Sequence, residues 1–320
     1  MPDRIPGSKP PTIADVARSA NVSVATVSNV LRGTGRFSAA TRLLVESTIS
    51  DLGYVPNRLA SELRRQSVTT IGLVVPKLQD EFFGELAAAV VDAGAEQDLL
   101  VVVGNSNGLP ERERSIAANF VEQRVRGAII VPISGDSTFI APSVAQVWVG
   151  AENASAPSVI VDEEEGGRLA GDLLAKRGCR RIAYVGTRSS TGLYRRLGVE
   201  DGFGRSVPLI EVRESTVSEG ESAIANLGEE FDGIACESDM LAIGAIRRAL
   251  RDDRNVPDRL AVVGHDNLRR SRDHLIPLTT IAQPIREIGL TAVSLLSDIL
   301  QGRQRSSVRL HPYLIRRDSA

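Results

Sequence analysis

The feature that most constrains the fold is a regular alternation of short apolar stretches and longer helical patterns after residue 67. The apolar stretches are continuous, as in Ile71-Gly-Leu-Val-Val75, which is typical of strands buried on both faces of a parallel sheet. Such strands need helices on both sides, so the pattern predicts an α/β body of two lobes with parallel sheets. The expected strands cover residues 71–75, 99–103, 128–131, 146–149, 159–161, 181–185, 233–236 and 260–263, and the expected helices cover residues 83–97, 111–123, 166–177, 220–227, 240–250 and 285–301.

The first 66 residues follow a different pattern, which predicts a small all-α head. Residues 12–31 divide into two short helices around Asn21, a residue type that tolerates the left-handed backbone of a tight turn. Thr12 and Ser23 are suitable N-caps for these helices. A helix-turn-helix places its second helix in the major groove of DNA, so this segment predicts sequence-specific DNA binding.

The spacing of apolar residues predicts how the head packs. In its second helix, Val27, Val30 and Leu31 are expected to face inward. A third helix is expected between the N-cap Ser38 and the stop signal Gly53. The apolar face of this third helix consists of Val45, Ile49 and Leu52. A further short helix is expected from Pro56, because proline suits a first helical turn.

Charge is distributed unevenly along the chain. Residues 1–66 contain nine Lys or Arg and five Asp or Glu, whereas the remainder contains 29 and 35. A basic head suits contacts with DNA phosphates, and an acidic body does not. A surplus of four positive charges is common on small domains, so charge alone is weak evidence for DNA binding.

The sequence favours a cytoplasmic protein without a membrane partner. The polar N-terminus, with Pro2, Asp3 and Arg4, predicts no signal peptide. No apolar run approaches the ~20 residues that span a bilayer. Cys179 and Cys236 lie far apart in sequence and are expected to be reduced thiols.

No metal or cofactor is expected, and a catalytic alternative finds little support. The histidines are scattered, and Gly202-Phe-Gly204 does not follow a strand as a dinucleotide fingerprint would. Gly104-Asn-Ser-Asn-Gly108 matches the Gly-x-Ser-x-Gly pattern of a hydrolase nucleophile and follows an expected strand. Pro110 and a loop separate Ser106 from its helix, however, and an esterase is not expected to carry a helix-turn-helix. We therefore expect no enzymatic activity.

Motifs along nearly the whole chain match one known family in that family's order. The N-terminal matches are Thr12-Ile-Ala-Asp-Val-Ala, Val22-Ser-x-x-Thr-Val-Ser28, Leu52-Gly-Tyr-x-Pro-Asn57 and Ile71-Gly-Leu-Val-Val-Pro76. The later matches are Ser238-Asp-x-x-Ala-x-Gly244, Val263-Gly-x-Asp266, Leu278-Thr-Thr-Ile-x-Gln-Pro284 and Arg317-Asp-Ser319. The chain thus resembles the lactose-repressor/galactose-repressor (LacI/GalR) family of transcription regulators.

The resemblance implies a helix-turn-helix domain at residues 1–55, a hinge helix and linker at 56–68, and an effector-binding and dimerisation domain at 69–320. That last domain would resemble a periplasmic-binding protein, with two lobes joined by three crossovers. The implied crossovers lie near residues 159–163, 279–284 and 312–316. The implied N-lobe covers about residues 69–160 and 284–313, and the implied C-lobe covers about residues 161–281 and 314–320.

The resemblance also implies a function. The chain would be a repressor whose affinity for a pseudo-palindromic, double-stranded operator is controlled by a small ligand, a sugar or related metabolite, bound between the lobes. Two heads must meet two half-sites, so a homodimer is expected. Two alternatives remain: a small-molecule-binding protein without a DNA role, and an architectural DNA-binding protein without an effector response.

Family resemblance implies which residues contact DNA. Val24, Ala25 and Asn29 would face base edges, and Leu63 would wedge into the minor groove. The full implied set is Thr12, Ser23, Val24, Ala25, Thr26, Ser28, Asn29, Asn57, Arg58, Ala60 and Leu63.

The resemblance likewise implies the ligand-binding residues, at the carboxyl ends of the strands, where open parallel sheets bind ligands. Asp266 matches the family's carboxylate, and Arg196 matches the arginine that reaches the ligand from the second lobe. The full implied set is Phe82, Phe83, Asn105, Ser106, Arg196, Ser238, Asp239 and Asp266.

The chain departs from the family near that arginine. The family's Arg-Leu-x-Gly-aromatic run reads Arg196-Leu-Gly-Val-Glu200 here, and the segment from Arg196 to Ile210 is shorter than usual, so a trimmed helix is expected. Ser238 replaces an Asn and His265 an aromatic residue. Either the ligand differs from a simple hexose or the site has degenerated.

Overall fold

A computed structural model of the chain describes residues 11–32, 37–54, 69–132, 144–153, 155–225 and 227–320. The chain forms two compact units, Met1–Val68 and Thr69–Ala320. In the described part of the chain, no helix is long and apolar enough to cross a bilayer.

In its described residues the head unit contains three of the helices expected from its sequence, α1 (Ile13–Ser19), α2 (Val24–Arg32) and α3 (Ala39–Leu52). The further helix expected from Pro56 lies outside the described residues. Thr12 caps α1 in a reciprocal capping box with Asp15. The turn between α1 and α2 places Asn21 at φ 53°, in the left-handed region. Gly53 ends α3 at φ 60°, as a C-terminal glycine does.

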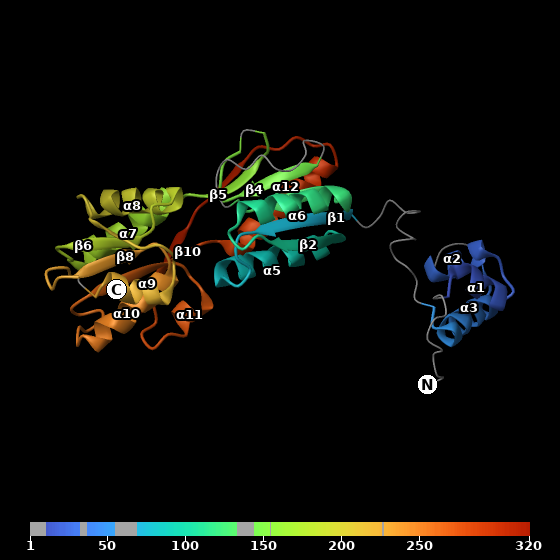
Figure 1. The fold of residues 1–320 in the computed structure, drawn as a ribbon, viewed down its shortest axis with the longest axis horizontal. Helices are drawn as coiled ribbons and strands as arrows, with labels where there is room; N and C mark the ends of the chain where they lie inside the picture. Colours follow the sequence, from blue (N-terminus) through green and yellow to red (C-terminus); the bar gives the residue numbers. More distant parts are fainter. Residues whose placement is uncertain (1–10, 33–36, 55–68, 133–143, 154, 226) are drawn as a thin grey trace. The chain divides into compact units, whose positions relative to one another are not determined.

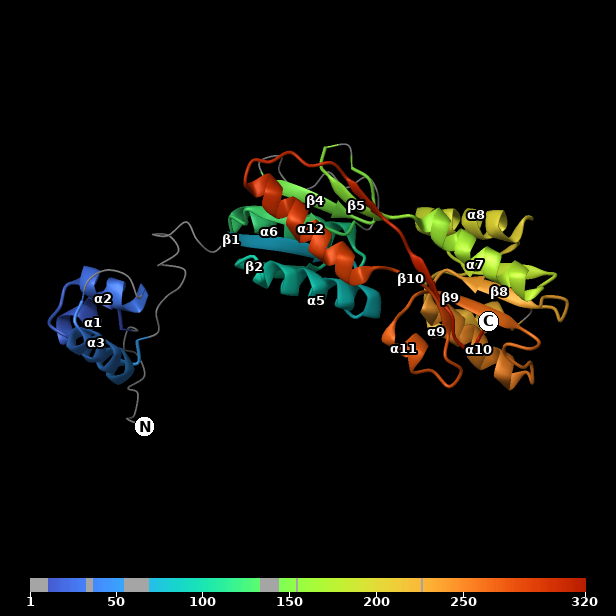
Figure 2. The same cartoon turned by 180° about the vertical axis from the view of Figure 1, so that it is seen from behind.

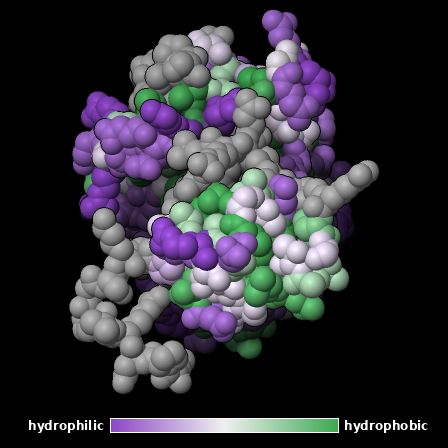
Figure 3. Space-filling model, turned by 90° about the vertical axis from the view of Figure 1, so that its right-hand side faces the viewer, coloured by the Kyte–Doolittle hydropathy of each residue, from purple (hydrophilic) through white to green (hydrophobic). Residues whose placement is uncertain are grey.

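The buried core of the head confirms most of the predicted inward positions. Its members are Val16, Ala17, Ala20, Val27, Val30 and Val45, with Tyr54 packed against them. Leu31 and Leu52 were expected inside, and both predictions are wrong, because they are 40% and 38% exposed. Each lies at the edge of an apolar helical stripe, where only the position of the neighbouring helix decides burial. Figure 3 shows apolar and polar surface intermixed on the face that it presents.

The body contains two six-stranded sheets, one in each lobe. The N-lobe sheet has the order β11-β5-β4-β3-β1-β2, with β1 (Thr69–Val75), β2 (Leu99–Asn105), β3 (Gly127–Ile130), β4 (Ala145–Val149), β5 (Ser158–Val161) and β11 (Val308–Leu310). The C-lobe sheet has the order β12-β10-β9-β8-β6-β7, with β6 (Ile182–Gly186), β7 (Leu209–Glu211), β8 (Gly233–Cys236), β9 (Ala261–Asp266), β10 (Thr279–Ala282) and β12 (Tyr313–Ile315). Among the strands that the structure describes, all pairs are parallel except β10 with β12.

Helices cover both faces of each sheet, as continuous apolar strands require. In the N-lobe, α5 (Glu81–Ala95) and α12 (Ile285–Leu300) pack side by side on one face, and α6 (Pro110–Glu122) covers the other. In the C-lobe, α9 (Val217–Ala223) and α10 (Asp239–Arg251) cover one face. Two further helices, α7 (Glu163–Arg177) and α8 (Ser190–Phe203), cover the other face. The short α11 (Arg269–Arg272) follows β9.

The chain passes between the lobes three times (Figure 1). It leaves the N-lobe between β5 and α7, returns between β10 and α12, and leaves again between β11 and β12. Each lobe is therefore built from segments that are discontinuous in sequence.

Every strand and helix range predicted for the body overlaps an element of the structure. The predicted ranges did not include β7, β10, β11, β12, α8 and α11. Of these, α8 spans 14 residues and is held against α7 by close backbone contact. A Cβ on Gly167 would lie 1.9 Å from the carbonyl oxygen of Arg195, and one on Gly198 would lie 1.9 Å from that of Glu164. These glycines thus set the position of α8 and of the side chains it directs into the cleft.

Candidate ligand-binding cleft and DNA-binding face

A cavity of about 310 Å³ lies between the two lobes of the body. It is lined by Asp80, Phe82, Phe83, Val131, Pro132, Val149, Gly150, Val159, Val161, Glu163, Thr191, Arg195, Ser215, Glu237, Ser238, Met240, Asp266, Leu268, Gln283 and Ile288. Mostly apolar walls with a few convergent polar groups are typical of a small-molecule site. Ion pairs between Lys77 and Glu214 (3.2 Å) and between Arg270 and Glu81 (3.4 Å) also link the lobes.

Asp266 occupies the end of β9 with an unusual backbone conformation. Its φ is 105°, which non-glycine residues rarely adopt and which costs free energy unless the surroundings impose it. No described residue donates a hydrogen bond to its carboxylate, although the residue is only 9% exposed. Burial raises the pKa of Asp266 well above its usual value, while the Arg195 charge opposes this rise. A strained, unsatisfied acceptor facing a cavity is the arrangement expected of a ligand contact.

Arg195, on α8, is the cation of the cleft. Its Nε donates to Glu163 Oε2 (2.6 Å), and its Nη1 donates to the Glu237 carbonyl oxygen (2.5 Å). Nη1 also lies 3.7 Å from Asp266 Oδ1. Burial opposes its charge, but the Glu163 and Asp266 carboxylates raise the pKa of Arg195. The guanidinium therefore stays ionised, with a hydrogen bond to Glu163 and a longer ion pair with Asp266.

The structure places Arg195, and not the predicted Arg196, in the lining of this cavity. Arg196 lies outside the cavity lining, and its Nε is 4.0 Å from Glu200 Oε1 on the same helix. Successive helical residues differ by about 100° in direction, so only one of two adjacent arginines can face the cleft. With Arg195 as the first residue of the family's Arg-Leu-x-Gly run, Gly198 falls at the required glycine. That glycine, rather than the Arg-Leu pair, was the informative signal.

A polar network joins the cleft to two of the crossovers. Gln283 follows β10 and donates from Nε2 toward both Glu163 carboxylate oxygens (3.4 Å), next to His265 Nε2 (3.3 Å). Burial, and then the Arg195 charge, lower the pKa of His265 well below its usual value, so its imidazole is neutral. Gln283 Oε1 is buried without a hydrogen-bond partner among the described residues. The cleft floor is thus connected to two of the segments that join the lobes.

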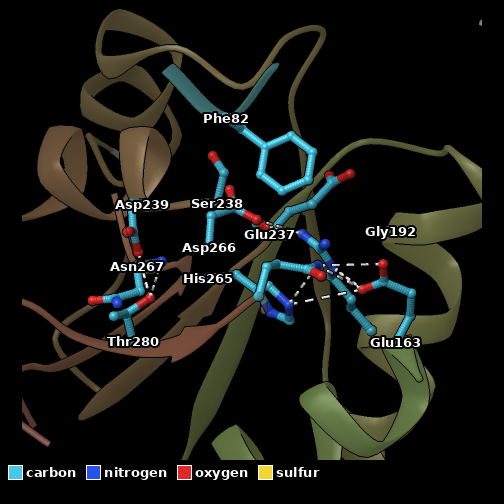
Figure 4. Close-up of polar contacts among 12 residues, drawn as sticks. Phe82, Glu163, Gly192, Glu237, Ser238, Asp239, His265, Asp266, Asn267 and Thr280 are labelled. Atoms are coloured by element: carbon cyan, nitrogen blue, oxygen red, sulfur yellow. Dashed lines mark hydrogen bonds and ion pairs between the residues drawn. The ribbon is translucent and has the colours of Figure 1, made fainter. Parts of the chain in front are cut away.

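Glu237 is held by the loop that precedes α8. Its carboxylate accepts hydrogen bonds from the Thr187 backbone N–H, the Thr187 hydroxyl (3.0 Å) and the Ser189 hydroxyl (3.1 Å). Figure 4 shows Glu237 grouped with Asp266 and Glu163, with the Phe82 ring on their N-lobe side. The negative charge of Glu237 is therefore fixed at the cavity wall.

The other predicted ligand residues divide into two groups. Phe82, Phe83 and Ser238 line the cavity together with Asp266. The remaining predicted residues, Asn105, Ser106 and Asp239, are absent from its lining.

Each residue of the second group has a structural role. Asn105 Oδ1 accepts from the Leu78 backbone N–H, and the fully buried Ser106 hydroxyl donates to Val75 O. Asp239 accepts from the Thr280 hydroxyl and the Leu268 backbone N–H, and burial raises its pKa to about 7. These side chains support the strand ends, and a buried Ser106 cannot serve as an exposed nucleophile.

Sequence reasoning missed seven polar residues of the cleft, namely Asp80, Glu163, Thr191, Arg195, Ser215, Glu237 and Gln283. Glu237 directly follows a predicted strand, and Glu163 lies two residues after another, so proximity to a strand end was an available signal. Their convergence depends on how the two sheets face each other, which no local pattern records.

Those predicted DNA-contacting residues that the structure describes lie in or beside α1 and α2. Val24 and Ala25 are exposed on α2, while Thr26, Ser28 and Asn29 are half-buried. The Ser23 hydroxyl caps α2 through the Thr26 backbone N–H (3.0 Å). Thr12 caps α1. The predicted hinge contacts, Asn57, Arg58, Ala60 and Leu63, lie outside the described residues.

Two other features of the body contrast with the cleft. A wider hollow of about 870 Å³ is lined by N-lobe residues such as Gln146 and Arg305, so lobe movement would not reshape it. Asp162, Glu165 and His311 bring three potential metal-ligand atoms within 4.8 Å of one another. Here Asp162 caps α7, and His311 Nδ1 pairs with Glu165 Oε2 (2.5 Å), which accounts for the group without an ion.

Known proteins share this architecture and much of the sequence pattern. Residues 12–57 match the lacI family of bacterial regulatory proteins, and residues 172–320 match the periplasmic binding protein-like domain. The HTH-type transcriptional repressor PurR of Escherichia coli O139:H28 is 29% identical over 96% of both chains. A Lac repressor dimer bound to operator and the anti-inducer ONPF superposes with a TM-score of 0.84, at 26% identity over 97% of this chain and 99% of that one. A transcriptional regulator CelR–cellobiose complex gives a TM-score of 0.70, at 26% identity over 97% and 100%.

A helix-turn-helix head and a two-lobed α/β body with a cleft define a ligand-regulated DNA-binding protein rather than an enzyme. The chain belongs to the LacI/GalR family of DNA-binding transcription regulators.

Proposed function

We propose that this chain is a repressor whose operator affinity is set by a small ligand bound between the two lobes. The observation that carries the proposal is the cavity that both lobes line, with the unsatisfied Asp266 carboxylate at its floor. PurR is named a repressor, and the related CelR holds cellobiose. A hydroxylated, sugar-like ligand fits the mixture of apolar wall and polar floor.

The proposed DNA-binding unit is a homodimer that acts in the cytoplasm, where the chromosome lies. A two-fold dimer presents two heads to the half-sites of a pseudo-palindromic operator. The Lac repressor relative is a dimer on its operator. In this proposal residues 56–68 form a hinge that Leu63 anchors in the minor groove, where an apolar wedge bends the duplex.

Closure of the lobes would couple the cleft to DNA. A ligand that contacts Asp266 and Arg195 favours the closed arrangement only by its differential affinity for the two lobe positions. Closure would turn the lobes about the crossovers that Glu163 and Gln283 join. It would also shift Thr69, the start of β1, and with it the segment leading to the head. The paired hinges of a dimer would then lose their spacing on the operator.

The direct test selects operator sequences from a random duplex library and titrates them at fixed salt, because salt strongly affects protein–DNA affinity. We expect a two-fold symmetric consensus and an affinity that a cleft ligand lowers by roughly 5–150-fold, the usual range of coupling between sites. Ligands are found by thermal shift, since a ligand of the native state raises the Tm. Failure to enrich any consensus, or cleft ligands without effect on DNA binding, would contradict the proposal.

A variant of α2 tests the mode of DNA reading. Asn29→Ala should relax the preference at one base pair of each half-site and cost roughly 1–3 kcal/mol there, because asparagine can both donate to and accept from adenine. Thr26→Ala, at a proposed phosphate contact, should lower the affinity for all operator sequences about equally. The measurement is a titration of operators with single substitutions. If Asn29→Ala lost affinity equally for all operator sequences, Asn29 would contact the DNA backbone instead of a base.

A further inference from the structure

The charged side chains of the cleft are mostly acidic. Among the described lining residues, Asp80, Glu163, Glu237 and Asp266 supply four carboxylates, and Arg195 supplies the one guanidinium. The Arg195 guanidinium is already engaged by Glu163 and lies near Asp266. An anionic ligand would therefore meet no unengaged cation among these residues.

The cleft floor also has more hydrogen-bond acceptors than available donors. The Asp266 carboxylate and Gln283 Oε1 are acceptors to which no described residue donates. The strongest donor, Arg195, already donates to Glu163 Oε2 and to the Glu237 carbonyl oxygen. A complementary ligand must therefore bring donors, because buried acceptors without partners cost about 1–3 kcal/mol each.

Three classes of ligand can be compared on this basis. A phosphorylated sugar brings negative charge to a wall of carboxylates, which is unfavourable in a partly buried site. A neutral sugar can donate hydrogen bonds to the acceptors, but it leaves the excess negative charge of the carboxylates uncompensated. An ammonium group brings three donors, no acceptor and a compensating charge. Burial raises the pKa of Asp80 and of Asp266, so a nearby cation would also restore their ionised forms.

We propose that the effector is a small hydroxylated amine of about hexose size, whose ammonium group is bound by Asp266 and the surrounding carboxylates. This inference rests on the proposed function, because it takes the cleft to be the effector site. The cavity of about 310 Å³ suits a single ring. Phe82, Phe83 and Val161 provide apolar surface for the C–H faces of such a ring.

The first test compares matched ligands on the full-length protein. Glucosamine, galactosamine and mannosamine are titrated beside their N-acetyl derivatives, which keep the skeleton and lose the charge. The parent hexoses and their 6-phosphates complete the series. At least one amine should raise the Tm at 10 mM or below and bind at least about tenfold more tightly than its N-acetyl and parent forms, the factor that corresponds to 1.4 kcal/mol. The 6-phosphates should give no shift.

The second test separates charge from shape at the cleft wall. Asp80→Asn keeps the oxygen that caps α5 through the Phe82 backbone N–H and removes the charge. We expect it to lower the affinity for the amine about three- to tenfold, consistent with a partly screened charge interaction. The affinity for any neutral analogue should stay unchanged. The matched control is Glu152→Gln, which changes an exposed N-lobe carboxylate outside the cleft lining. It should alter neither the affinity for the amine nor the affinity for a neutral analogue.

The outcomes distinguish this inference from the proposed function. A neutral or phosphorylated compound that binds as tightly as its amine overturns the charge inference, and so does the absence of a shift with all three amines. Equal weakening of charged and neutral ligands by Asp80→Asn overturns it as well. If a neutral sugar binds the cleft and releases operator, the proposed function stands and this inference fails. If an amine binds the cleft without changing operator affinity, the charge preference of the cleft stands, but the proposed function and the role of the amine as effector fail.

Discussion

Replacing Arg195 by alanine is expected to lower the free energy of unfolding of the body by about 3–5 kcal/mol, because it leaves buried carboxylates without their cation. The Arg195 side chain is 8% exposed, and it holds Glu163 and the Glu237 carbonyl oxygen at once. Arg196→Ala removes the next residue of α8, whose side chain is 29% exposed and pairs loosely with Glu200. That variant should cost less than about 1 kcal/mol, as exposed ion pairs do.

Denaturant unfolding of both variants measures this contrast. The double variant Arg195→Met with Glu163→Gln provides a further control, because removing both charges leaves less uncompensated charge. It should therefore be more stable than Arg195→Met alone. Similar destabilisation by Arg195→Ala and Arg196→Ala would mean that the buried network carries little of the stability of α8.

Replacing Asp266 by asparagine should abolish the effector response while operator affinity without ligand stays unchanged. Asparagine has nearly the same size and tolerates a left-handed backbone, so the φ of 105° can be kept. Loss of the charged acceptor should lower effector affinity by roughly 100-fold, about 2.7 kcal/mol, as expected when one side of a charge-assisted contact is removed. Adding Arg195→Ala should reduce the response little further, because the first change already empties the site.

The measurement is an operator titration with and without the ligand identified by thermal shift. Asp266→Asn should also unfold at an equal or higher denaturant concentration, since it removes a buried carboxylate that no described residue satisfies. A normal effector response in this variant would place the ligand elsewhere. Weaker operator binding without ligand would instead assign Asp266 a purely structural role.

The sequence alone determined those features that depend on neighbours in the chain. Thr12, Asn21 and Gly53 adopt the caps and turn predicted from their residue types, because these conformations are set within one helical turn. The continuous apolar strands of the body likewise predicted two parallel sheets covered on both faces. Such strands can satisfy backbone hydrogen bonds and bury both faces in few other ways.

Only the tertiary structure decided which side chains meet in the cleft. Arg195 rather than Arg196 faces Asp266, because close contact between α7 and α8 at Gly198 fixes the rotation of α8. Asn105 lies near a strand end, yet it supports the loop at Leu78 instead of the cavity.

The acidic character of the cleft had the same origin. Glu163, Glu237 and Gln283 come from distant parts of the chain and converge only because the chain passes three times between the lobes. Local patterns fix helices, strands and caps through short-range sterics and hydrogen bonds, whereas a site between two lobes depends on contacts across more than a hundred residues of sequence.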